Sequence, residues 1–166
     1  VLSEFDQPNE GIVKKLAQTY LYFGFGAEAR QVVELSETDS RVNMVLLSLA
    51  DIMEYGYEKG SSYLERFADC DSDAALWGIL AGKEPSPAAT LNSNAALQAL
   101  SALPLHLRVF IAPELSRRFL FYGDKENSEA ALRSMERTAE PLSDSAKLVK
   151  ADLEIKQGKL EVAGVR

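Results

Sequence analysis

Apolar residues recur along almost the whole chain at steps of three and four positions, which is the period of an amphipathic α-helix. Strict alternation of apolar and polar residues, the pattern of a half-buried strand, is nearly absent. The pattern therefore predicts an all-α protein. The expected helices span residues 9–23, 27–36, 40–55, 60–68, 73–82, 93–103, 105–122, 128–138, 144–157 and 159–166. Ten such helices would pair into about five antiparallel hairpins.

Glycines, prolines and short polar residues predict where these helices begin and end. A left-handed glycine commonly ends a helix, and an apolar stripe is followed by glycine at Gly24, Gly56, Gly82, Gly123 and Gly158. Side chains that accept hydrogen bonds from free amides at a helix start are Asp39 or Ser40, Asn92 or Ser93, Asn127 or Ser128, and Ser143 or Asp144. Pro104 suits a first helical turn, whereas Pro113 is expected to kink or split its helix near Ala112.

A series of large, small, aromatic and glycine positions recurs along the chain. Its clearest copy, in the order large, small, aromatic, glycine, turn, small and large, is Leu16, Ala17, Tyr20, Gly24, Gly26, Ala29 and Val33. The spacing returns at Leu115, Ser116, Phe119 and Gly123, followed by Ala130 or Ala131, and more loosely at Ala151, Gly158, Leu160 and Ala163. In the middle of the chain, Tyr57 stands in place of the glycine and Ser62 in place of the small residue. The series resembles the signature of the tetratricopeptide repeat (TPR), a helical hairpin that occurs in arrays.

The resemblance implies an α-solenoid, irregular in the middle, in which hairpins stack because none can bury its apolar faces alone. A small residue on each helix lets the two backbones of a hairpin approach closely. Residues 1–166 would form a single TPR-like helical-repeat domain. Because the chain opens at Val1 without methionine and stops at Arg166 within a predicted helix, we expect it to be part of a longer one.

TPR-like proteins commonly bind protein segments on the concave wall of the stack. Matching positions place that groove at Lys14, Gln18, Leu21, Tyr22, Leu47, Asp51, Glu54, Arg117 and Phe121. Lys14 falls where some members have a lysine that grips a C-terminal carboxylate, but Gln18 replaces the accompanying asparagine. The mixed charge of this wall predicts an apolar or basic partner segment rather than a carboxylate clamp.

The composition of the chain argues against some classes of binding partner. Hydrophobic residues make up 46% and charged residues 26% of the chain, as in a folded, soluble domain. With 18 basic and 25 acidic side chains the net charge is -7, which repels phosphate backbones, so nucleic acid is not expected as a partner. The longest apolar run, from Val45 to Ile52, is interrupted by Ser48 and Asp51 and is shorter than the ~20 residues of a membrane span. The composition does not distinguish a cytoplasmic protein from a periplasmic or secreted one.

Candidate ligand motifs lack the surroundings that they need. The segment from Gly24 to Ala29 fits the G-x-G-x-x-A pattern of dinucleotide sites, but a helical stretch precedes it where that motif requires a strand. Three acids spaced as in a calcium loop, Asp69, Asp71 and Asp73, are followed by alanine and leucine where the loop needs glycine and glutamate. We expect these acids to form a solvated turn that caps the next helix.

Catalytic motifs are also missing. His106 is the only histidine and Cys70 the only cysteine, and neither has a nucleophile elbow or a glycine-rich oxyanion turn beside it. We therefore expect no catalytic residue, no cofactor and no metal ligand.

The leading hypothesis is a non-catalytic protein-interaction module whose groove binds a peptide, a helix, a partner domain or a second copy of the chain. Two alternatives stay open: a structural or assembly spacer within a larger protein, and a helical enzyme domain around a small-molecule pocket. A closed pocket with several buried ionisable groups would favour the enzyme, and an open apolar groove would favour docking. An exposed apolar patch at the Arg166 end would favour the spacer.

Overall fold

The computed structural model describes residues 9–36, 38–60, 62–84, 86–136, 148–149 and 151–152, and this part of the chain is helical without strands. The prediction of an all-α protein is confirmed to that extent. The elements are α1 (Glu10–Tyr22), α2 (Gly26–Glu34), α3 (Arg41–Tyr55), the 3₁₀ turn η1 (Glu65–Phe67), α4 (Ala74–Ala81), α5 (Ser93–Ala102), α6 (Leu105–Phe121) and α7 (Lys125–Glu136). The predicted helices 144–157 and 159–166 lie outside the described residues, except for helical residues 148–149 and 151–152.

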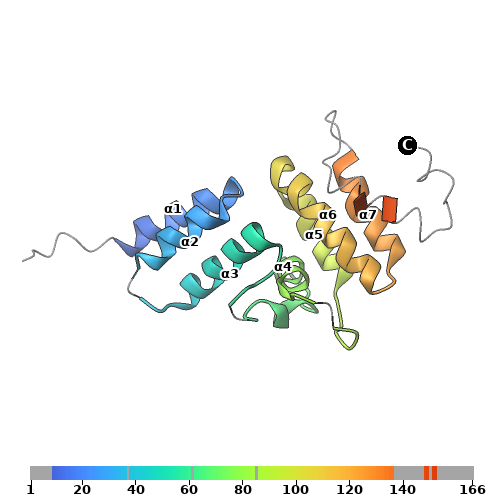
Figure 1. Ribbon diagram of the computed structural model, residues 1–166, viewed down its shortest axis with the longest axis horizontal. Helices are drawn as coiled ribbons and strands as arrows, with labels where there is room; N and C mark the ends of the chain where they lie inside the picture. The colour runs from blue at the N-terminus through green and yellow to red at the C-terminus, as the bar shows by residue number, and fades with distance from the viewer. Residues whose placement is uncertain are drawn as a thin grey trace, which may run out of the picture.

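The helices follow one another in space in the order of the sequence. Figure 1 shows α1, α2 and α3 together at one end, α5, α6 and α7 together at the other, and α4 between the two groups. The extensive contacts among the described elements join each α-helix to the next one or two along the chain. Stacks of hairpins have this pattern of near-neighbour contacts.

Glycine ends three of the described helices in the left-handed conformation that the sequence predicted. The φ angles are 81° at Gly24, 79° at Gly56 and 75° at Gly123. The same prediction for Gly82 is wrong, because its φ of -62° and ψ of 130° are those of extended backbone. The backbone continues from α4 in an extended conformation at this glycine, and the Gly82 carbonyl accepts a hydrogen bond from Arg118 on α6.

Two of the predicted helix starts are confirmed. Ser40 accepts a hydrogen bond from the Asn43 amide at 3.1 Å, and Asn92 accepts one from the Ala95 amide at 3.0 Å. Pro104 lies directly before α6, as its N-cap. The predicted start of α7 at Asn127 or Ser128 is wrong, because α7 begins at Lys125. Asp124 precedes it, and its carboxylate accepts a hydrogen bond from the Asn127 amide at 3.2 Å. The predicted start at Ser143 or Asp144 lies outside the described residues.

The acidic turn before α4 is solvated, as predicted, because Asp69, Asp71 and Asp73 are all exposed. Its capping role is wrong. Asp73 occupies the N-cap of α4, but its side chain accepts no capping hydrogen bond.

The predicted helix at 60–68 is wrong apart from the short turn η1. Glu58 is buried just before it, and its carboxylate accepts hydrogen bonds from the Tyr63 amide at 2.9 Å and the Leu64 amide at 3.1 Å. The hydroxyl of Ser48 on α3 donates to the same carboxylate. Because a buried carboxylate needs such donors, the backbone wraps around Glu58 as a loop as far as Leu64.

The expected split at Pro113 does not occur, because α6 runs unbroken through it. The proline removes one helical hydrogen bond. Buried residues stand on both sides of it, including Ile111, Ala112 and Leu115, and α6 packs on α4, α5 and α7. This burial keeps the helix continuous despite the missing amide.

Small side chains lie where the hairpins are tightest. Ala17 of α1 and Ala29 of α2 are both fully buried, in keeping with the nesting that the sequence predicted. In the pair α6 and α7, Ser116 and Ser128 are fully buried and their hydroxyl oxygens are 2.7 Å apart. Ala131, which the sequence offered together with Ala130, is the fully buried member of that pair.

Gly26, expected only as a turn residue, is the tightest point between α2 and α3. A Cβ atom on it would lie 2.5 Å from the carbonyl oxygen of Ala50 and 3.0 Å from the amide nitrogen of Glu54. Gly26→Ala should therefore push α2 away from α3 and lower the free energy of unfolding by about 1–3 kcal/mol, measured by urea denaturation.

Gly60→Ala is the matched control, because a Cβ atom at Gly60 would meet nothing within 4 Å. That variant should be unchanged or stabilised by up to about 1 kcal/mol. Equal stability of the two variants would contradict the close packing at Gly26.

Candidate functional site

Three of the nine predicted groove residues lie together between α1 and α3. The structure has a groove of about 470 Å³ here, called the α1–α3 groove, and its lining is Lys14, Gln18 and Leu21 from α1 with Arg41, Val42, Val45, Leu46 and Leu49 from α3. Helical spacing places the three α1 residues on one face, because they are four and three positions apart. Among the α3 residues of this lining, Arg41, Val42, Val45, Leu46 and Leu49 were not predicted from the sequence.

The α1–α3 groove has an apolar floor and cationic edges. Leu21 and Leu46 are buried, whereas Val42 is exposed. Lys14 and Arg41 are both exposed, and the described residues form no ion pair with either. Although the whole chain has a net charge of -7, the edges of this groove are positively charged and attract negative groups.

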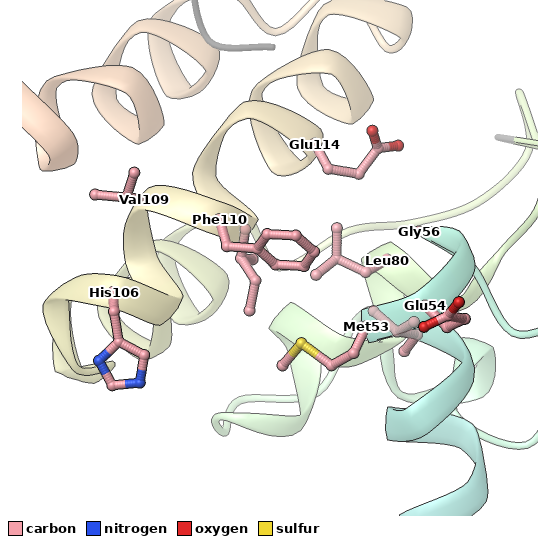
Figure 2. Close-up of a pocket in the computed structure, with 10 residues that line it drawn as sticks. Met53, Glu54, Gly56, Leu80, His106, Val109, Phe110 and Glu114 are labelled. Carbon is pink, nitrogen blue, oxygen red and sulfur yellow. The ribbon is translucent and has the colours of Figure 1, made fainter. Parts of the chain in front are cut away.

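A second hollow, called the α3–α6 cleft, separates the two groups of helices and measures about 480 Å³. Its lining is Ile52, Met53, Glu54 and Gly56 at the end of α3, Leu80 of α4, and His106, Val109, Phe110, Ile111 and Glu114 of α6. Figure 2 shows the Phe110 ring reaching from α6 toward Leu80 and Met53. Glu54 is the one predicted groove residue in this lining.

Tyr22, another of the nine, lies at the meeting point of α1 and α6. The Nε2 atom of His106 is 2.6 Å from the carbonyl oxygen of Tyr22. Since a carbonyl only accepts, Nε2 carries the proton and donates it. The two rings contact edge to face with centroids 5.0 Å apart, and Phe23 stacks on the imidazole at 6.4 Å. A residue early in the chain thus touches one 84 positions later.

Asp51 lines neither hollow, because its buried carboxylate holds α2, α3 and the following loop together. One oxygen pairs with Arg30 of α2, and the other accepts the Lys59 amide at 2.9 Å. Burial lowers the pKa of the Arg30 guanidinium, but the hydrogen bonds and charges of Asp51 and Glu34 together outweigh it, so the net pKa shift is upward. Asp51 therefore stabilises the fold and is not available to a ligand.

The remaining predicted residues lie apart from both hollows. Leu47 lies in a shallow depression between α2 and α3. Arg117 is exposed and pairs with Glu114 one turn earlier, and Phe121 is exposed at the end of α6. The nine residues therefore do not form one continuous wall.

Arg118, which the sequence analysis did not select, is buried behind the α3–α6 cleft. Its Nε donates to Glu114 at 3.2 Å, and its terminal nitrogens donate to three carbonyls at the ends of α3 and α4, namely Gly82, Gly56 at 3.3 Å and Leu80 at 3.4 Å. A signal was present in the sequence: Arg118 stands three positions after Leu115, on the apolar stripe of α6.

The ionisable groups of the α3–α6 cleft are open to solvent or already paired. Glu54 and His106 are exposed, and Glu114 pairs with two arginines. Across the described residues, no group of three or more His, Cys, Asp and Glu side chains could hold a metal ion.

Comparisons of the chain with protein-family models, curated proteins and solved structures gave no match. Among the helices that the structure describes, none has both the length and the apolar character needed to cross a membrane.

Arg118→Met should lower the free energy of unfolding by about 3 kcal/mol, because it removes the hydrogen bonds that Arg118 donates to three carbonyls and to one carboxylate oxygen of Glu114. Arg117→Met is the control on the same helix, since its side chain is 50% exposed and that of Arg118 is 7% exposed. The control should lose less than about 1 kcal/mol. Denaturant unfolding of both variants measures the difference, and a loss for Arg118→Met as small as that of the control would refute its anchoring role.

Proposed function

We propose that this chain is a non-catalytic protein-interaction module with a TPR-like arrangement of hairpins, and that the α1–α3 groove binds a segment of a protein partner. The observation that carries the proposal is the groove itself, an apolar floor between α1 and α3. Helices that are paired side by side commonly receive a peptide or an amphipathic helix in this way.

The charge at the groove edges selects the partner chemistry. Lys14 and Arg41 are the charged residues of the lining. An apolar segment that carries aspartate or glutamate would bury its apolar side chains on Leu21, Val45 and Leu46 and pair its carboxylates with the two cations. The sequence suggested an apolar or basic segment, but it did not include Arg41 among the groove residues. With Arg41 in place, acidic segments suit this groove better.

The assembly alternative has support of its own at the start of the stack. Ile12 and Leu16 of α1 are 65% and 41% exposed, and they stand four positions apart on one helix face. Apolar side chains on the end helix of a stack are typical of a face that a further hairpin covers. A spacer within a larger protein is therefore the second candidate.

Peptide display against the folded chain tests the docking proposal. Selected sequences should combine large apolar residues with Asp or Glu, because the groove offers an apolar floor and two cations. The double variant Lys14→Glu with Arg41→Glu should reverse the choice toward Lys and Arg, and sequencing of the selected pools measures the change.

Lys15→Glu provides the matched control, because Lys15 is exposed on the same helix but does not line the groove. Selection on this variant should resemble that on the unchanged chain. Equal enrichment of acidic peptides on the double variant and the control would mean that the groove does not bind them.

A further inference from the structure

We infer that the α3–α6 cleft is a second docking site, and that it binds a basic amphipathic helix of a protein partner. The site is separate from the α1–α3 groove, because the two linings have no residue in common. The inference therefore does not rest on the function proposed for that groove.

The walls of the α3–α6 cleft can receive large apolar side chains. Its volume of about 480 Å³ falls within the range of ordinary ligand pockets. Leu80 and Ile111 are buried at its base, whereas Phe110 is 56% exposed and reaches across it from α6 (Figure 2). A side chain inserted beside Phe110 would remove this ring from water, which is how aromatic anchors contribute to interfaces.

The apolar surface continues beyond the cleft as a row of rings. His106 and Phe110 stand one turn apart on α6, and both line the cleft. Phe23 stacks on His106, and Phe25 follows with its centroid 6.4 Å from that of Phe23. Phe23, Phe25 and Phe110 are all exposed. A surface with several exposed rings beside the cleft fits a helix with apolar residues at successive turns better than it fits a single small molecule.

The charged side chains that line the α3–α6 cleft, apart from His106, are the acids Glu54 and Glu114. Glu54 is exposed and forms no ion pair within the described residues. It stands in the last turn of α3, where the helix dipole adds partial negative charge. Glu114, the other acid of the lining, already pairs with Arg117 and Arg118. Glu54 is thus the group that a lysine or arginine of the partner would meet.

The two hollows therefore have opposite preferences. Cations edge the α1–α3 groove, whereas the carboxylate of Glu54 edges the α3–α6 cleft. A segment whose charge suits one hollow meets like charge at the other hollow. Each hollow therefore attracts its own partner and repels the partner of the other.

The test uses two synthetic helical peptides with identical leucine positions, one with lysine and one with glutamate on the polar face. Fluorescence anisotropy of the labelled peptides measures binding to the full chain. We expect the lysine peptide to bind the unchanged chain at least about tenfold more tightly than it binds the Glu54→Lys variant. Phe110→Ser should weaken it by about tenfold or more.

Phe121→Ser is the matched control, because Phe121 is on the same helix and 55% exposed but does not line the cleft. It should bind the lysine peptide as the unchanged chain does. A second control, Lys14→Glu, changes only the α1–α3 groove and should leave this binding intact. Circular dichroism of each variant verifies that the helices remain folded.

Four outcomes would overturn the inference. Three of them are equal loss of binding in Phe110→Ser and Phe121→Ser, undiminished binding by Glu54→Lys, and no binding of the lysine peptide at millimolar concentration. Tighter binding of the lysine peptide by Lys14→Glu is the fourth, because it would place the peptide in the α1–α3 groove.

Discussion

The arrangement of the helices depends above all on the buried guanidinium of Arg118. Both α3 and α4 end with carbonyl groups directed at it, and α6 supplies both the arginine and the carboxylate of Glu114. A guanidinium has five donors and no acceptor, so it can bind a cluster of oxygens that no apolar side chain could stabilise. The ends of helices also carry partial negative charge that a cation offsets. One side chain thereby fixes the position of α6 against α3 and α4, and with it the width of the cleft between them.

The sequence predicted the elements that depend on local interactions. The period of apolar residues located α1, α3, α5 and α6 to within a few positions, and Ser40 and Asn92 act on amides only three residues away. The loop around Glu58 could not be predicted in this way. Its carboxylate is held by Ser48, ten positions earlier on another element, and periodicity does not indicate that an acid will be buried. Gly82 was missed for a related reason, since its partner Arg118 is 36 positions away.

The candidate-site residues that share a face of one helix could be predicted from the sequence. Those that depend on how two helices pack together could not. Lys14, Gln18 and Leu21 share a face of α1, so their spacing was sufficient. Arg41 and the other lining positions of α3 depend on how α3 packs on α1, which the repeat spacing described only loosely in the middle of the chain. Asp51 had the right spacing for a groove residue, but Arg30 on α2 binds it instead. The same limit applies to His106, because its contact with Tyr22 joins α1 to α6.

The hydrogen bond between His106 and Tyr22 also bears on the order in which parts of the chain fold. Contacts between neighbouring helices close short loops, so each group of helices can form quickly and without the other. Joining residues that are 84 positions apart restricts far more of the chain at once. We expect this bond to form after the helices on either side of it. The mouth of the α3–α6 cleft would then be completed in the final stage of folding, when two preformed groups of helices meet.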